Sequence, residues 1–236
     1  MAKAARKVGI MKILILHGWT YSTDKWTQLV DLLAVKNSVE LLKIPGLTEK
    51  LDNVWSLDDY VEWLNKKVDS QKSKVVLIGH SNGGRISLAY TAKYPQKVTN
   101  LILIDSAGIY HNELPIRLKR LVFKTIAKIG RKITKSEILK KALYKLSREA
   151  DYENASPVIK KTMINLITFD IAPLLPNIKI PTLIIWGKRD KVTPIKDGQT
   201  LHRLIKNSKL KIIADARHSP MFSNPKEVVK IINESI

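Results

Sequence analysis

Three residues of types suited to nucleophilic catalysis each follow a stretch that predicts a β-strand in this sequence of 236 residues. Ser81 comes first, and Asp190 and His218 follow in that order along the chain. A serine hydroxyl is a poor nucleophile near neutral pH, so it needs a histidine to take its proton and a carboxylate to orient that histidine. Because the carboxyl ends of parallel strands meet at one edge of a sheet, the three side chains can converge there. We therefore predict that Ser81, Asp190 and His218 form a catalytic triad.

The serine lies in the sequence Gly-His-Ser-Asn-Gly at residues 79–83, between an apolar stretch at 74–78 and a helical pattern at 85–94. A G-x-S-x-G sequence between a strand and a helix is typical of a nucleophile elbow, which points the serine hydroxyl away from the backbone. We expect both flanking glycines to be required, because a side chain at either would collide with the neighbouring strand or helix. The helix N-terminus would also place positive potential where an oxyanion forms.

A second acid competes with Asp190 for the role of orienting the histidine. Asp105 follows the predicted strand at 98–104 and is the rival candidate. We favour Asp190 and interpret Asp105 as a turn or cap residue. His218 is the histidine that lies downstream of both acids at a strand end, whereas His202 lies inside a helical pattern.

Short apolar stretches alternate with longer amphipathic stretches along the chain. This alternation is the sequence pattern of βαβ crossovers and a parallel sheet. We predict an α/β fold with a mostly parallel sheet of about six strands flanked by helices. The predicted strands cover residues 11–16, 39–44, 74–78, 98–104, 182–186 and 210–214, and the predicted helices include 24–35, 85–94, 195–205 and 226–236.

One region breaks this alternation. Residues 110–172 contain amphipathic helical patterns and no convincing strand. We predict that they form a helical cap inserted into the core, which divides the core into residues 11–109 and 173–236. Residues 1–10 read as a basic N-terminal extension.

These motifs resemble the α/β-hydrolase fold superfamily over nearly the whole chain. Besides the three candidate catalytic residues, the resemblance includes Leu-His-Gly-Trp at 16–19, Pro-Gly at 45–46 and Ile-Pro-Thr-Leu-Ile-Ile-Trp-Gly at 180–187. The resemblance implies an oxyanion hole formed by the backbone N–H groups of Trp19 and Asn82. It also implies that Gly18 lies beside the substrate.

The predicted cap contributes two further candidate substrate contacts. His111 lies at its start and could line the entrance, although a solvated loop is the simpler interpretation. Arg117 belongs to a cluster of basic residues that could attract a carboxylate or another anion. We therefore expect a small ester or acyl substrate, with an anionic substrate as one alternative and a solvated basic face as the other.

The composition excludes several classes of protein. The chain has no cysteine, which excludes disulfides, thiolate metal sites and a cysteine nucleophile. It has 41 Lys+Arg against 21 Asp+Glu, but its basic residues are not interleaved with aromatic ones, so we expect no specific nucleic-acid partner. We expect no membrane span, a cytoplasmic location, and no metal or organic cofactor, because no apolar stretch is long enough and no ligand cluster is apparent.

We interpret the chain as a serine hydrolase that cleaves carboxylic esters through an acyl-enzyme intermediate. Hydrolysis of C–C bonds and acyl transfer remain alternatives, because the same residues support them on this fold. A non-catalytic binding protein is the alternative of a different class, and the complete set of three residues argues against it.

Overall fold

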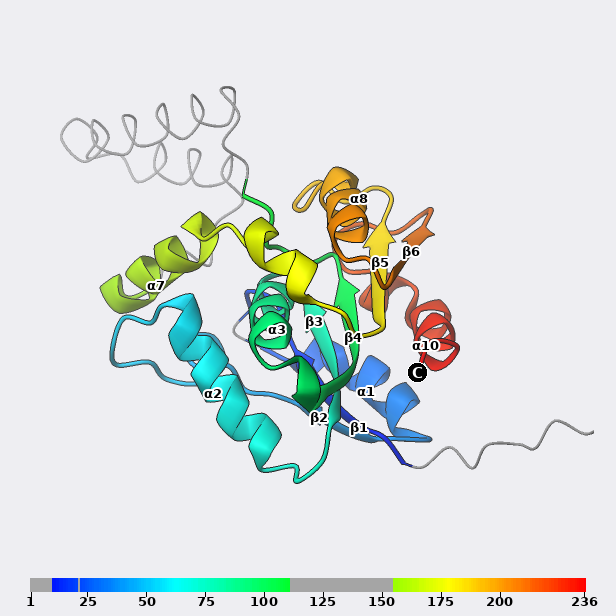
Figure 1. The fold of residues 1–236 in the computed structure, drawn as a ribbon, viewed down its shortest axis with the longest axis horizontal. Helices are drawn as coiled ribbons and strands as arrows, with labels where there is room; N and C mark the ends of the chain where they lie inside the picture. The colour runs from blue at the N-terminus through cyan, green and yellow to red at the C-terminus, as the bar shows by residue number, and fades with distance from the viewer. Residues whose placement is uncertain (1–9, 21, 111–154) are drawn as a thin grey trace, which may run out of the picture.

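The computed structural model describes residues 10–20, 22–110 and 155–236, and these form a six-stranded sheet (Figure 1). The strand order is β2-β1-β3-β4-β5-β6, and every neighbouring pair is parallel. The predicted fold class is thereby confirmed. The strands are β1 (Lys12–Leu16), β2 (Ser38–Leu41), β3 (Val75–His80), β4 (Val98–Ile104), β5 (Thr182–Gly187) and β6 (Ser208–Ile213).

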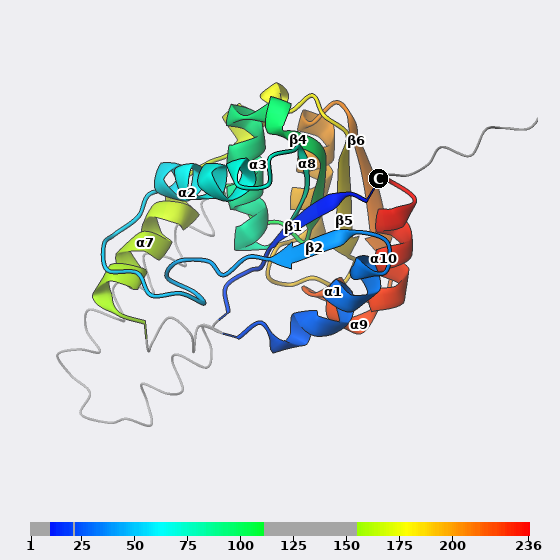
Figure 2. The same cartoon turned by 90° about the horizontal axis from the view of Figure 1, so that it is seen from below.

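Helices cover both faces of the sheet, as Figures 1 and 2 show. One face carries α2 (Leu57–Asp69), α3 (Asn82–Lys93) and α8 (Ile195–Leu204), and the other carries α1 (Thr27–Ala34), α9 (Pro220–Ser223) and α10 (Pro225–Asn233). Since both faces are covered, the inner strands are apolar at nearly every position rather than at every second one. Leu14 and Leu16 of β1 pack into the apolar core on the face covered by α2, α3 and α8. Ile13 and Ile15 pack into the core on the face covered by α1, α9 and α10.

All six predicted strands are present; β4 has the predicted ends, and the other five have shifted ends. β2 ends at Leu41 rather than at residue 44, because the chain leaves the sheet edge for a turn in which Ile44 O accepts hydrogen bonds from three backbone N–H groups. β3 continues to His80, and α3 begins at once with Asn82, three residues before the expected start. The elbow is therefore tighter than the sequence pattern indicated.

The segment between β4 and β5 leaves and rejoins the core at one place. Ile171 N donates to Gly108 O at 3.2 Å, and Tyr110 N donates to Asp170 Oδ1 at 3.3 Å. Its described part contains α7 (Pro157–Thr168) and a 3₁₀ helix, η3 (Ala172–Asn177). The predicted cap at 110–172 and the extension at 1–10 lie mostly outside the described residues.

Helix α7 is attached to the core through the segment before α2. Thr162 Oγ1 accepts from Trp55 N at 3.0 Å, and Asn165 Nδ2 donates to Trp55 O at 3.1 Å. Ser56, next in the chain, caps α2 through a reciprocal pair of hydrogen bonds with Asp59. These contacts place α7 near the carboxyl edge of the sheet, where the candidate site lies.

Candidate active site

Ser81 lies in the turn between β3 and α3 with φ 51° and ψ −119°. A non-glycine residue rarely adopts this backbone conformation, and such strain is concentrated at functional sites. The flanking glycines are required sterically, as the sequence predicts. A Cβ at Gly79 would lie 2.6 Å from Gly84 Cα, and one at Gly83 would lie 2.2 Å from Leu16 O.

Asp190 and His218 meet at the carboxyl edge of the sheet, because each follows the end of one of two neighbouring parallel strands. Asp190 follows β5 and His218 follows β6. His218 Nδ1 lies 2.7 Å from Asp190 Oδ2. A carboxylate at this nitrogen fixes the imidazole with its proton on Nδ1, which leaves Nε2 free to accept a proton.

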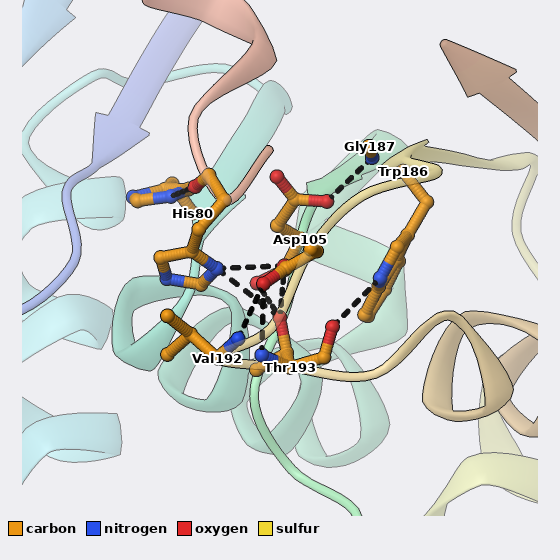
Figure 3. A network of polar contacts seen from close by, with 8 residues as sticks. His80, Asp105, Trp186, Gly187, Val192 and Thr193 are labelled. Atoms are coloured by element: carbon orange, nitrogen blue, oxygen red, sulfur yellow. Dashed lines mark hydrogen bonds and ion pairs between the residues drawn. The ribbon is translucent and has the colours of Figure 1, made fainter. Parts of the chain in front are cut away.

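The Asp190 carboxylate is held by further donors from its own loop. Val192 N and Thr193 N donate to Oδ1 at 2.7 and 3.1 Å, and Thr193 Oγ1 donates to Oδ2 at 2.7 Å. Burial alone would raise the pKa of Asp190, but the hydrogen bonds from His218 and Thr193 outweigh it and lower that pKa below its ordinary value. Figure 3 shows this network, with Val192 and Thr193 below the dashed contacts and Asp105 and Gly187 above them.

Ser81 and His218 both line a cavity of about 460 Å³. Among the described residues, the Ser81 hydroxyl makes no hydrogen bond with His218, so the two groups must close to about 2.6–3.2 Å for proton transfer. Gly18 also lines the cavity. The apolar part of the described lining comprises Trp19, Trp26, Met163, Val192 and Phe222.

Two backbone amides are available beside the serine. Within the described chain, neither Trp19 N nor Asn82 N donates a hydrogen bond to another residue. Asn82 is the first residue of α3, where helical N–H groups have no partner inside the helix. His17 Nδ1 donates to Gly18 O at 2.8 Å and so holds the loop that carries Trp19. His111 and Arg117, the other predicted substrate contacts, lie outside the described residues.

Comparison with known proteins identifies the family. A family model described as serine aminopeptidase, S33, matches residues 49–225, well over half of the chain. The chain belongs to this family of α/β hydrolases. The resemblance inferred from the motifs is thus confirmed.

Relatives of this α/β hydrolase carry names of lipases and esterases. It is 28% identical to the pimeloyl-[acyl-carrier protein] methyl ester esterase of Wigglesworthia glossinidia brevipalpis, over 95% of this chain and 93% of that protein. It is 24% identical to the human monoacylglycerol lipase ABHD6, over 93% and 73% of the two chains. Among solved structures, it resembles MGS-MChE2, an α/β-hydrolase enzyme from the metagenome of lagoon sediments of Mar Chica, Morocco. That match has a TM-score of 0.71 at 25% identity and covers 96% and 90% of the two chains.

Asp105, the second candidate acid, lies close to the pair but makes a different contact. Its Oδ1 accepts from Gly187 N at 2.8 Å, while its buried Oδ2 has no hydrogen-bond partner among the described residues. Burial raises the pKa of Asp105 to about 8; the bond from Gly187 opposes this shift, and the nearby Asp190 carboxylate adds to it. The geometry therefore assigns the direct contact with His218 to Asp190.

His80, Asp105 and His218 are also residue types that bind metals, and their ligand atoms lie within 4.8 Å of one another. His80 Nε2 and His218 Nδ1 are both engaged in hydrogen bonds within the protein. We therefore interpret the cluster as the surroundings of the candidate triad rather than as a metal site.

Sequence reasoning missed two residues of this site. Thr193 was not singled out, yet it contacts the carboxylate through both its amide and its hydroxyl. The signal was available, because an aspartate in a turn commonly accepts from backbone N–H groups two or three residues later. His80 is the second, and nothing in the sequence indicates the contact that it makes with the loop of His218.

Proposed function

We propose that this α/β hydrolase cleaves carboxylic esters through an acyl-enzyme intermediate, with Ser81, His218 and Asp190 as the catalytic triad. The observation that carries the proposal is the 2.7 Å contact between His218 Nδ1 and Asp190 Oδ2, beside a cavity that His218 shares with Ser81. The strained backbone of Ser81 and the names of the relatives support it.

In the first half of the reaction, Ser81 Oγ attacks the ester carbonyl carbon while His218 Nε2 takes the hydroxyl proton. The resulting imidazolium is stabilised by Asp190, which remains ionised because its donors lower its pKa. The tetrahedral intermediate then collapses, and His218 gives the proton to the leaving alcohol. In the second half, His218 takes a proton from water, the hydroxide attacks the acyl carbon, and the acid leaves as Ser81 Oγ regains the proton.

Two backbone N–H groups would stabilise the oxyanion of both tetrahedral intermediates. Trp19 N and Asn82 N are unpaired in the described chain and flank Ser81 in the fold. Donors fixed before the reaction need no reorganisation when charge develops, and removing one commonly costs about 10²–10³ in turnover. Backbone donors also cannot be removed by side-chain substitution, so their contribution persists in triad variants.

The test is active-site labelling. A fluorophosphonate probe should label the wild-type chain and leave Ser81→Ala unlabelled, because the probe reacts with an activated serine hydroxyl. Ser22→Ala is the matched control, since Ser22 lines the same cavity and has no role in the proposed mechanism. Labelling of Ser81→Ala, or no labelling of the wild type, would contradict the proposal.

A substrate panel separates the remaining alternatives. p-Nitrophenyl esters of increasing chain length test ester cleavage, and an aminoacyl p-nitroanilide tests amide cleavage. A vinylogous diketone tests C–C hydrolysis, and added alcohol tests acyl transfer, because the same acyl-enzyme can react with a different nucleophile.

An anionic substrate is favoured by the described lining of the cavity. Lys25 is the one permanently charged side chain among its described residues, and no ion pair with an acid engages it there. We therefore propose that an acyl or alcohol group bearing a carboxylate or phosphate is accepted at this end of the cavity.

In the part of the chain that the structure describes, no helix is long and apolar enough to cross a membrane.

A further inference from the structure

His80, the residue before the proposed nucleophile, makes a contact that no packing role requires. Its Nε2 lies 2.9 Å from the backbone carbonyl oxygen of His218. A carbonyl oxygen only accepts, so Nε2 must carry the proton and donate it. The residue is 6% exposed, and this bond is partly buried beside the cavity that Ser81 and His218 share. The last residue of β3 is thereby joined directly to the main chain of the proposed general base.

The imidazole ring of His80 is also packed against its neighbours on its other sides. A Cβ placed on Gly18 would lie 2.8 Å from His80 Nδ1, so this edge of the imidazole packs against the backbone of the loop that carries Trp19. The ring of Trp26 meets it edge-on with centroids 5.8 Å apart, and the ring of His218 lies 5.0 Å away. His80 therefore contacts the loops of the proposed oxyanion donor and the proposed base at once.

The segment at 214–219 has few other attachments to this side of the sheet. Among the described residues, the bond from His80 is the one hydrogen bond that joins this segment to β3 or α3. Its other bonds lead to the end of β6, to α9 and to the loop after β5, where Arg189 N donates to Ala216 O at 2.9 Å and the His218 ring bonds to Asp190. Without His80, the base would remain paired with its acid but lose its hydrogen-bonded link to the strand that carries the nucleophile.

We propose that His80 is a positioning residue, whose imidazole holds the main chain of His218 at the distance and angle from Ser81 that proton transfer requires. This inference rests on the proposed triad. Proton transfer is sensitive to such placement, and a misplacement of about 1 Å can cost about 10²-fold in rate.

The protonation state of the His80 imidazole suits this positioning role. Burial, together with the nearby His218, lowers the pKa of His80 to about 3; the bond to the His218 carbonyl and the charge of Asp190 act in the opposite direction. The ring is therefore neutral and adds no positive charge when His218 becomes an imidazolium during the reaction.

The test compares two variants of similar side-chain length. His80→Gln keeps an N–H donor at the end of the side chain, whereas His80→Met keeps the bulk and removes the donor. We expect His80→Met to lower kcat for a p-nitrophenyl ester by about 10²-fold with KM changed less than about threefold. His80→Gln should recover kcat to within about fivefold of wild type. The rate of fluorophosphonate labelling should follow kcat, since both depend on the pairing of Ser81 and His218.

A control and a measurement on the unaltered protein complete the design. His202→Met makes the same change at an exposed histidine of α8 and should leave kcat unchanged. Thermal unfolding must show that the His80 variants fold. Equal kcat in folded His80→Gln and His80→Met, or wild-type kcat in His80→Met, would overturn the inference.

If either variant fails to fold, the wild-type protein still decides the matter. A long-range ¹H–¹⁵N spectrum at pH 7 should show His80 with its proton on Nε2 and protected from exchange, whereas a proton on Nδ1 or rapid exchange would overturn the inference. Failure of the proposed function is distinguishable, because a wild-type chain that neither hydrolyses esters nor reacts at Ser81 would disprove the triad itself.

Discussion

Replacing Asp105 by asparagine should stabilise the protein at alkaline pH much more than at acid pH. Folding moves the pKa of this carboxyl from 3.8 to about 8. Between these values the folded chain keeps the proton while the unfolded chain has lost it, so the unfolded state binds fewer protons and stability falls as pH rises. Asparagine does not titrate, and its amide oxygen can still accept from Gly187 N.

The magnitude follows from the two pKa values. From pH 5 to pH 8, the wild-type chain should lose roughly 4 kcal/mol of unfolding free energy through Asp105, at 1.36 kcal/mol per pKa unit. For a chain of this size, that corresponds to a relative shift of roughly 8–16 °C in the melting temperature. The difference in unfolding free energy between Asp105→Asn and wild type isolates the contribution of Asp105, because all other titratable groups are present in both proteins.

The assay is urea unfolding at pH 5 and pH 8, with melting temperatures measured alongside. Asp31→Asn makes the same change at an exposed position on α1 and should leave the pH dependence as it is in wild type. If the difference in unfolding free energy between Asp105→Asn and wild type were the same at pH 5 and pH 8, the buried carboxyl would not be protonated in the folded state. That result would refute the reasoning.

Four further outcomes are expected. Asp190→Asn should lower kcat by about 10⁴-fold while the fold persists, because the imidazole loses its preferred tautomer; steady-state kinetics test this. Thr193→Val removes the hydroxyl donor to the carboxylate and should cost about 1–3 kcal/mol in urea unfolding, so an unchanged midpoint would contradict the role of that bond. Gly83→Ala places a Cβ 2.2 Å from a backbone oxygen and should destabilise by about 3 kcal/mol, visible as a lowered melting temperature. Lys25→Gln should raise KM about two- to fivefold for an ester with a terminal carboxylate and leave KM for its neutral isostere unchanged, and equal effects on both would argue against an anionic substrate.

The sheet and the elbow could be predicted from the sequence because local signals specify them. The four inner strands β1, β3, β4 and β5 are mainly apolar stretches ended by a polar or glycine residue, and the steric need for Gly79 and Gly83 follows from the turn between strand and helix. The ends of elements were less predictable. β2 stops at Leu41 because the chain then leaves the sheet for the turn at Ile44, which the sequence pattern at 39–44 does not reveal.

The contacts around the candidate triad were harder to predict, because they join residues that lie far apart along the chain. The contact between His80 and the His218 carbonyl joins residues 138 positions apart, and a backbone oxygen has no sequence signature. The protonated state of Asp105 likewise depends on burial by segments that are remote along the chain. Residue types and spacing indicate which side chains could react, whereas the contacts that tune them are set by the packing of loops.

The pairing of β4 with β5 has a consequence for how the chain is made. Leu101 pairs with Thr182, although about 80 residues separate these strands. A ribosome adds about 5–20 residues per second, so the first four strands are complete for roughly 4–16 s before β5 has been synthesised. During that interval the free edge of β4 presents unpaired backbone groups, and the apolar side chains of Ile102 and Ile104 lack the partners that α9 and α10 later supply on one face of the sheet. We expect a nascent chain that stalls within this interval to aggregate or to recruit a chaperone at this strand.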